Sequence, residues 1–252
     1  MRVAKFSVAG EVRFGIVDGP ELVVLKGHPL FTNYETTGAR VAIKDVQLLP
    51  PTLPTSKLIC IGKNYADHAA EMGGEAPAEP LMFLKPLTAA IGQGETIVLP
   101  AISGQVDHEC ELAVVISSVA KNVPADKALD FVWGYTIAND VTARDLQNKD
   151  GQWTRAKGFD TFCPIGPWIE TEFEPEDQVI ETRVDGELRQ HGRLNQMIHD
   201  VPRIIEHVSQ VMTLLPGDII LTGTPAGIGP IEAGQVVEVS IEGIGELTNP
   251  VS

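Results

Sequence analysis

The sequence predicts a mainly β protein with a few helices, an α+β fold. Short apolar runs of strand length recur along the 252 residues, and turns rich in the 24 glycines and 18 prolines separate them. Three stretches have the composition or the apolar periodicity of a helix. Strands and helices do not alternate regularly, which argues against a βαβ series with a parallel sheet.

The first fifty residues are expected to form short strands joined by turns. Runs at residues 3–8, 12–17 and 21–25 are separated by Ala-Gly and Asp-Gly-Pro turn signals. Residues 50–54 read Pro-Pro-Thr-Leu-Pro, which predicts a stiff, extended connector. We therefore expect a small N-terminal β domain at residues 1–53 and a larger domain at residues 54–252.

The larger domain is expected to contain three helices. After a strand at 57–62, residues 64–72 have helical composition and end at two glycines. A second helix is expected near 124–131, with proline in its first turn. A third is expected at about 197–212, where apolar residues form one stripe. The remaining segments read as short strands.

Charge and composition exclude several kinds of partner. The chain carries 19 basic and 34 acidic residues, a net charge of −15, which repels phosphate backbones and anionic lipid. We therefore expect no nucleic-acid partner and no membrane partner. No stretch has the length of a membrane span and no secretory signal is visible, so we expect a cytoplasmic protein. The three cysteines form no CxxC pair and are expected to be buried, reduced thiols.

Three acidic residues are spaced to hold one metal ion. Glu109 and Glu111 open an apolar run at 112–116 that reads as a buried strand, so their side chains point to the same face. Adjacent carboxylates at a buried strand repel one another unless a cation joins them. Asp140 closes a second apolar run at 136–138. Oxygen donors without His or Cys favour Mg²⁺, Mn²⁺ or Ca²⁺. The alternative is a solvated strand face and an ordinary turn.

Other residues suggest catalysis. His68 and Glu71 are three apart on the expected helix and share one face. A histidine held by a carboxylate is a common general base, although an exposed helix pair is the alternative. Lys157 is a candidate cation for an oxyanion, and Lys85 is a second. The alternative is a lysine that reaches solvent.

The segment 222–229 is rich in glycine and follows a strand. It contains no Walker lysine, and no helix pattern follows it, so it is not read as a nucleotide-binding loop. We expect a tight loop whose amides and hydroxyls face a small anionic ligand.

Six segments together resemble the fumarylacetoacetate hydrolase family, in the family's order across about residues 57–250. They are 62–68, 83–86, 108–112, 139–147, 156–160 and 222–225. The resemblance implies a mixed β-roll fold, a homodimer, and an N-terminal domain like that of many bacterial members. It implies a Mg²⁺ or Mn²⁺ ion held by Glu109, Glu111 and Asp140, with His68 and Glu71 as the acid/base pair, Lys157 as a catalytic cation, and Gln147, Lys85 and Thr224 as substrate contacts.

One departure from the family pattern narrows the substrate. Longer fumarylacetoacetate hydrolases carry a fourth carboxylate ligand just upstream of the catalytic histidine. Here that stretch reads Cys60-Ile61-Gly62, without an acid. This places the chain with the shorter members and argues against fumarylacetoacetate itself as the substrate.

The resemblance implies a divalent-metal-dependent enzyme that acts on small 2-oxo (β-diketo) dicarboxylic acids through a metal-stabilised enolate. The presence of both His68 and Glu71 favours acylpyruvate hydrolysis, with fumarylpyruvate or acetylpyruvate, or oxaloacetate decarboxylation. An alternative is the 2-hydroxyhepta-2,4-diene-1,7-dioate isomerase or the 5-carboxymethyl-2-oxo-hex-3-ene-1,7-dioate decarboxylase of aromatic catabolism. From another class, a non-catalytic metal- or metabolite-binding protein is the alternative. The sequence leaves the choice among these reactions open.

Overall fold

The computed structural model describes residues 1–52, 54 and 56–252, and it confirms a mainly β fold with few helices. Most strands belong to one large sheet. They are β1 (Arg2–Val8), β2 (Glu11–Asp18), β3 (Glu21–Leu25), β4 (Thr36–Ala42), β5 (Gln47–Leu49), β6 (Leu58–Gly62), β7 (Leu81–Lys85), β8 (Ala90–Ile91), β10 (Cys110–Ile116), β11 (Val132–Asn139), β13 (Cys163–Glu170) and β16 (Ile219–Leu221). Its main order is β4-β3-β2-β1-β13-β11-β10-β16-β6-β7, with β5 beside β1 and β8 beside β13.

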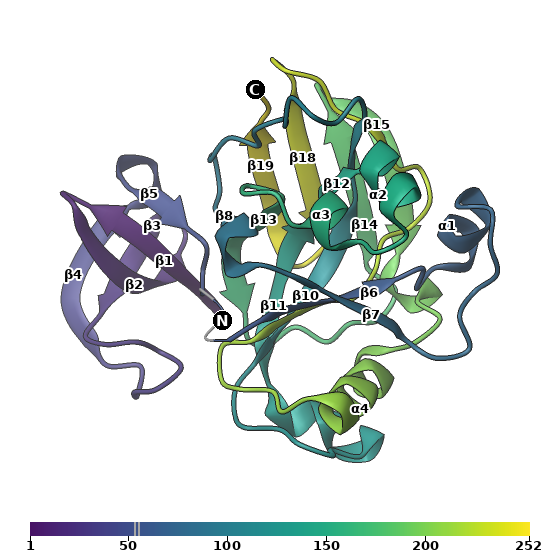
Figure 1. Cartoon of the computed structure of the whole chain (residues 1–252). Helices are drawn as coiled ribbons and strands as arrows, with labels where there is room; N and C mark the ends of the chain where they lie inside the picture. The colour runs from purple at the N-terminus through teal and green to yellow at the C-terminus, as the bar shows by residue number, and fades with distance from the viewer. Residues whose placement is uncertain (53, 55) are drawn as a thin grey trace.

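The N-terminal strands β1–β5 form a lobe beside the larger body (Figure 1). Strands β1, β2 and β3 match the three that the sequence predicts. Strand β4 was not expected, because most of its residues are exposed and it has no apolar run. Strand β1 also pairs with β13, so the sheet crosses the expected boundary after residue 53. That boundary stays a prediction, and the expected connector includes Leu53, which lies outside the described residues.

Two smaller sheets complete the roll. A four-stranded sheet has the order β15-β14-β18-β19, and a three-stranded sheet has the order β12-β9-β17. Their strands are β9 (Val106–His108), β12 (Thr142–Ala143), β14 (Val179–Val184), β15 (Glu187–Arg193), β17 (Gly229–Pro230), β18 (Val236–Ile241) and β19 (Gly245–Pro250). Leu112 and Ile137 of the large sheet share one buried cluster with Ile180 and Val239 of the four-stranded sheet. The main core therefore lies between these two sheets.

The α-helices are short, and all of them lie in the larger body (Figure 1). They are α1 (Ala66–Glu71), α2 (Arg144–Asp150), α3 (Thr154–Lys157) and α4 (Val201–Val211), with 3₁₀ turns η1 (Ile43–Asp45), η2 (Leu87–Ala89), η3 (Ala125–Phe131) and η4 (Leu194–Gln196). The first and third expected helices are α1 and α4. Helix α4 begins later than expected, because the Asp200 side chain accepts a hydrogen bond from the amide of Arg203 and caps the first turn.

The second expected helix is the 3₁₀ turn η3 and not an α-helix. Only Ala128 of its residues is buried, so the segment has little apolar surface to hold a longer helix against the core. Helices α2 and α3 were not expected. Among the described residues, no helix is long and apolar enough to cross a membrane. All three cysteines are buried free thiols, and burial raises the pKa of Cys110 and of Cys163 to about 12.

Candidate metal and catalytic site

Strand register brings the three predicted carboxylates together. Strands β10 and β11 are antiparallel, and Glu111 pairs with Ala138. Asp140 follows β11, and its amide donates to the carbonyl of Glu109 at 2.8 Å. The carboxylate oxygens of Glu109, Glu111 and Asp140 lie within 4.8 Å of one another, and all three residues are buried. The alternative of a solvated strand face is therefore wrong, and the role of Asp140 as a metal ligand stays a prediction.

Strand alternation sorts the neighbouring side chains as the sequence predicts. Glu109 and Glu111 both face the cavity described below. Cys110, which lies between them in the sequence, is not part of the cavity lining. The side chain of His108, which precedes Glu109, contacts Gln190, with His108 Nδ1 at 3.0 Å from Gln190 Oε1. His108 is fully buried, and burial lowers its pKa, so its ring is neutral.

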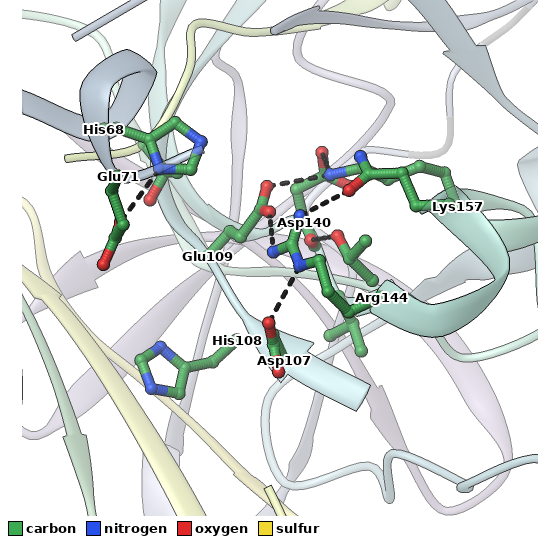
Figure 2. Close-up of polar contacts among 12 residues, drawn as sticks. His68, Glu71, Asp107, His108, Glu109, Asp140, Arg144 and Lys157 are labelled. Carbon is green, nitrogen blue, oxygen red and sulfur yellow. Dashed lines mark hydrogen bonds and ion pairs between the residues drawn. The ribbon is translucent and has the colours of Figure 1, made fainter. Parts of the chain in front are cut away.

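Three buried cations bind the carboxylates, and Figure 2 labels two of them, Lys157 and Arg144. Lys157 Nζ lies 2.8 Å from Glu109 and 2.6 Å from Asp140. Lys85 Nζ lies 2.6 Å from the other oxygen of Asp140, and Arg144 donates to Glu109 at 2.5 Å. Both lysines are almost fully buried, so neither reaches solvent. Such pairs keep charges in the interior only because the geometry and the further hydrogen bonds offset desolvation.

The pKa values of this cluster follow from burial and neighbouring charge. Burial alone raises the pKa of Glu109, but the charges of Lys157 and Arg144 outweigh it and hold that pKa well below its usual value. Burial lowers the pKa of Lys157, but Asp140 and Glu109 outweigh it and raise that pKa. These groups are therefore charged at neutral pH.

Glu111 differs from the other two carboxylates. Burial, and then the charges of Asp140 and Glu109, raise its pKa well above the usual value. Its Oε2 accepts a hydrogen bond from the amide of Gly223 at 2.6 Å, and within the described residues it forms no ion pair. A divalent cation beside Glu111 would relieve this repulsion. Three hard oxygen donors fit Mg²⁺ or Mn²⁺, so the residues present fit the metal that the family resemblance implies.

His68 and Glu71 form the second predicted group. Both lie on α1, and His68 Nδ1 is 3.3 Å from Glu71 Oε2. The amide of Gly227 donates to the other oxygen of Glu71 at 3.1 Å. A neutral His68 that donates from Nδ1 leaves Nε2 free to accept a proton. Figure 2 shows this pair on the opposite side of Glu109 from Lys157.

One cavity joins most of the predicted site residues. Those that line it are His68, Glu109, Glu111, Asp140, Gln147, Lys157 and Thr224. Glu71 adjoins this set through His68, and Lys85 adjoins it through Asp140. The structure thus brings every predicted site residue into one place, while their catalytic roles stay predictions.

Sequence reasoning did not single out Arg144, although it lies inside one of the six segments. Its guanidinium is buried and bonds Asp107 at 2.8 Å, Gln147 at 2.6 Å and Glu109 at 2.5 Å. It starts helix α2, which was not predicted. The usable signal was its position three residues before Gln147, which places both on one helix face.

Two amides of the glycine-rich loop bond the protein's own acids. Those of Gly223 and Gly227 donate to the carboxylates of Glu111 and Glu71 and so position them, while the contact of this loop with a small anionic ligand stays a prediction. Gly223 has φ +101°, and a Cβ there would lie 2.6 Å from that of Asn64, which explains the glycine. Thr224 lines the cavity and accepts from Gln190 at 2.8 Å.

Comparison with known proteins agrees with this geometry. A sequence model of the family described as "Fumarylacetoacetate (FAA) hydrolase C-terminal" matches residues 57–252. A second, described as "Rv2993c-like, N-terminal", matches residues 1–51.

Curated relatives cover most or all of the chain. The protein named Rv2993c of Mycobacterium tuberculosis is 53% identical and covers 100% of this chain and 98% of its own. The mitochondrial oxaloacetate decarboxylase of Dictyostelium discoideum is 44% identical over 75% of this chain and 89% of its own. The oxaloacetate tautomerase YisK of Bacillus subtilis is 42% identical over 87% of this chain and 77% of its own.

Solved structures have the same fold. The 5-carboxymethyl-2-hydroxymuconate delta-isomerase of Mycobacterium smegmatis has a TM-score of 0.92 and 51% identity, and covers 100% of this chain and 99% of its own. The 2-hydroxyhepta-2,4-diene-1,7-dioate isomerase of Mycobacterium marinum has a TM-score of 0.92 and 49% identity, and the match covers 100% of this chain and 98% of its own. The fumarylpyruvate hydrolase of Pseudomonas aeruginosa, in complex with Mn²⁺ and pyruvate, has a TM-score of 0.75 and 34% identity. The match covers 81% of this chain and 91% of its own.

Proposed function

The chain belongs to the fumarylacetoacetate hydrolase family, and from this we propose that it is a divalent-metal-dependent enzyme that cleaves C–C bonds in small 2-oxo dicarboxylic acids. The reaction is acylpyruvate hydrolysis or oxaloacetate decarboxylation. The observation that carries the proposal is that the buried carboxylates, Lys157 and the His68–Glu71 pair all meet at one cavity.

The metal site supplies Lewis acidity. Glu109, Glu111 and Asp140 would hold a divalent ion, which would supply a Lewis acid for the oxygens of a 2-oxo acid. Residues around the metal site contribute further electrostatic stabilisation. Lys157 and Arg144 are buried and place fixed positive charge beside the three carboxylates, where a low dielectric constant strengthens electrostatic interactions.

The acid/base pair determines which bond cleavage is possible. With an acylpyruvate, His68 Nε2 takes a proton from a water molecule, whose oxygen attacks the distal carbonyl. Glu71 holds the ring through Nδ1 and stabilises the imidazolium. The C–C bond then breaks, and the electron pair and a proton pass to the pyruvate fragment. With oxaloacetate, loss of CO₂ leaves the enolate of pyruvate, which then takes up a proton, and no attack by water is needed.

A second reaction class would use the same site without cleavage of a C–C bond. Two of the solved relatives are named as isomerases, and one curated relative is named as an oxaloacetate tautomerase. Proton transfer on an enolate requires no C–C cleavage, so isomerisation or tautomerisation is the second candidate. The relatives named as a decarboxylase and as a fumarylpyruvate hydrolase support the first.

The test is incubation of the purified protein with Mg²⁺, with Mn²⁺ or with EDTA and each candidate acid, followed by proton NMR. The acids are acetylpyruvate, fumarylpyruvate, oxaloacetate and 2-hydroxyhepta-2,4-diene-1,7-dioate. Metal-dependent release of pyruvate supports the proposal, and the second product separates hydrolysis from decarboxylation. A changed diene or enol signal without cleavage supports the second candidate. Metal binding with no change in any acid supports a non-catalytic binding protein.

We also propose that the protein is a homodimer, on the family resemblance alone. Light scattering coupled to size-exclusion chromatography tests this directly, because the monomer has a mass of 27.1 kDa.

A further inference from the structure

Lys63 is a cation of the cavity that sequence reasoning did not assign. It follows strand β6 and lines the cavity together with Met72, Phe83 and Trp153. Its side chain is half-buried, and its Nζ lies beside Gly74, where a Cβ would come within 2.9 Å of it. Within the part of the chain that the structure describes, its ammonium forms no ion pair.

The other two cations of the cavity lining are already paired. Lys157 bonds Glu109 and Asp140, and Arg144 bonds Glu109 and Asp107. Their charge is largely offset by the protein's own acids. Among the described lining residues, Lys63 is therefore the cation whose charge remains available to an anion.

The backbone holds Lys63 in an unfavourable conformation. Its φ is +55°, in the left-handed region that glycine adopts more easily than lysine. The next residue fixes this geometry, because the Asn64 side chain donates to the carbonyls of His199 and Thr222 and accepts from the amide of His199. A lysine kept at a position better suited to glycine points to a use for its side chain.

We propose that Lys63 binds the distal carboxylate of the substrate and selects dicarboxylic over monocarboxylic 2-oxo acids. The inference deepens the proposed function and rests on it. The 2-oxo acid end belongs at the buried carboxylate cluster, and the second carboxylate needs a separate cation. Phe83 and Trp153 line the same cavity, and their apolar surfaces exclude water and strengthen an ion pair there. The net charge of −15 makes such a local cation more necessary.

The test compares malate with lactate, because these 2-hydroxy acids differ in the distal carboxylate and neither is consumed. Binding is measured by calorimetry in Mn²⁺ for wild type, Lys63→Met, Lys63→Arg and the exposed control Lys127→Met. Methionine keeps the side-chain length and the same backbone demand without the charge. We expect wild type to prefer malate at least tenfold, Lys63→Met to lose that preference with lactate affinity unchanged, and Lys63→Arg to restore most of it.

Catalysis supplies the second readout. For oxaloacetate, Lys63→Met should raise KM at least tenfold while kcat changes less than twofold. A malate preference that persists in Lys63→Met, or that wild type lacks, overturns the inference about Lys63. Absence of turnover by wild type counts instead against the proposed function, since the malate–lactate comparison does not depend on turnover.

Discussion

Two groups of ion pairs in this molecule have similar chemistry and different settings. In the N-terminal lobe, Arg40 bonds Asp18 and Glu21, and its side chain is 44% exposed. In the larger body, Lys157 bonds Glu109 and Asp140, and its side chain is 3% exposed. Water and salt weaken the first group, so each of its pairs contributes little. The second group had to be desolvated, so its presence calls for another explanation.

The ion pairs around Lys157, called the buried group below, contain unequal numbers of acidic and basic side chains. Four buried carboxylates, Glu109, Glu111, Asp140 and Asp107, meet only three cations, Lys85, Lys157 and Arg144. When Glu111 is ionised, this group carries one more negative than positive charge, and the charges of Asp140 and Glu109 act on Glu111 directly. This difference from the lobe supports the proposal that the buried group binds a further cation.

Removing a carboxylate of the buried group should have the largest effect. Asp140→Asn should lower kcat/KM by about a thousandfold or more, above the ~10–100-fold typical of residues that only support metal ligands. It should also abolish Mn²⁺ binding measured by calorimetry. The matched change in the lobe, Asp18→Asn, should alter neither quantity. Equal activity in the two variants would remove the functional distinction between the two regions.

The two histidine–carboxylate pairs extend the comparison. The His68 side chain is 6% exposed, whereas the His191 side chain, 2.8 Å from Glu181, is 55% exposed. His68→Gln should lower acylpyruvate hydrolysis by about 10²–10⁴-fold, the usual contribution of a general base. It should lower oxaloacetate decarboxylation by less than about tenfold, because that reaction requires no water attack. Parallel steady-state assays of both substrates, with His191→Gln as the control, measure the ratio. An equal loss in both reactions would contradict the water-activating role.

A buried carboxylate can stabilise the fold without a part in catalysis, and we expect Asp218 to be such a residue. Its side chain is fully buried and accepts from Ser56, from the amides of Lys57 and Leu215 and from Lys57 Nζ. Asp218→Asn should lower the free energy of unfolding by about 3 kcal/mol, since several charge-assisted bonds weaken together. Denaturant unfolding measures this loss. Activity per folded molecule should stay near wild type, and a large loss of kcat would place Asp218 in the catalytic machinery instead.

Metal should stabilise the buried group and leave the lobe unaffected. At a concentration about 100 times Kd, Mn²⁺ should add ~2.7 kcal/mol to the free energy of unfolding. For a protein of this size that corresponds to a rise in Tm of roughly 5–10 °C. Differential scanning calorimetry should show this rise in wild type and Asp18→Asn but not in Asp140→Asn. The same rise in all three proteins would indicate binding elsewhere.

The sequence predicted the buried group better than its surroundings, for a physical reason. Strand alternation has a strict period, so the shared face of Glu109 and Glu111 was readable from two apolar runs. Two of the three cations that pair with it, Arg144 and Lys157, come from α2 and α3, which are too short for a periodic signal. The cations Lys85 and Lys157 were selected without their pairing to Asp140, because that contact depends on how distant strands and helices pack.

The smallest effect is expected at an exposed pair of the larger body. Hydrogen bonds from His191 and Arg183 outweigh partial burial and lower the pKa of Glu181 below its usual 4.5. A carboxylate whose folded pKa is lowered stabilises the fold above about pH 4.5, and that contribution is lost as the pH falls through the folded pKa. Glu181→Gln should therefore lower Tm by about 1–2 °C at pH 7, and the difference should shrink as the pH falls below 4.5 or when salt is raised to about 1 M. Thermal melts across this pH range test the sign. A difference in Tm that grows as the pH falls would mean that the folded protein favours the protonated carboxyl of Glu181. The distinction between weak exposed ion pairs, such as those of Arg40, and the buried pairs of Lys157 would then not hold for this residue.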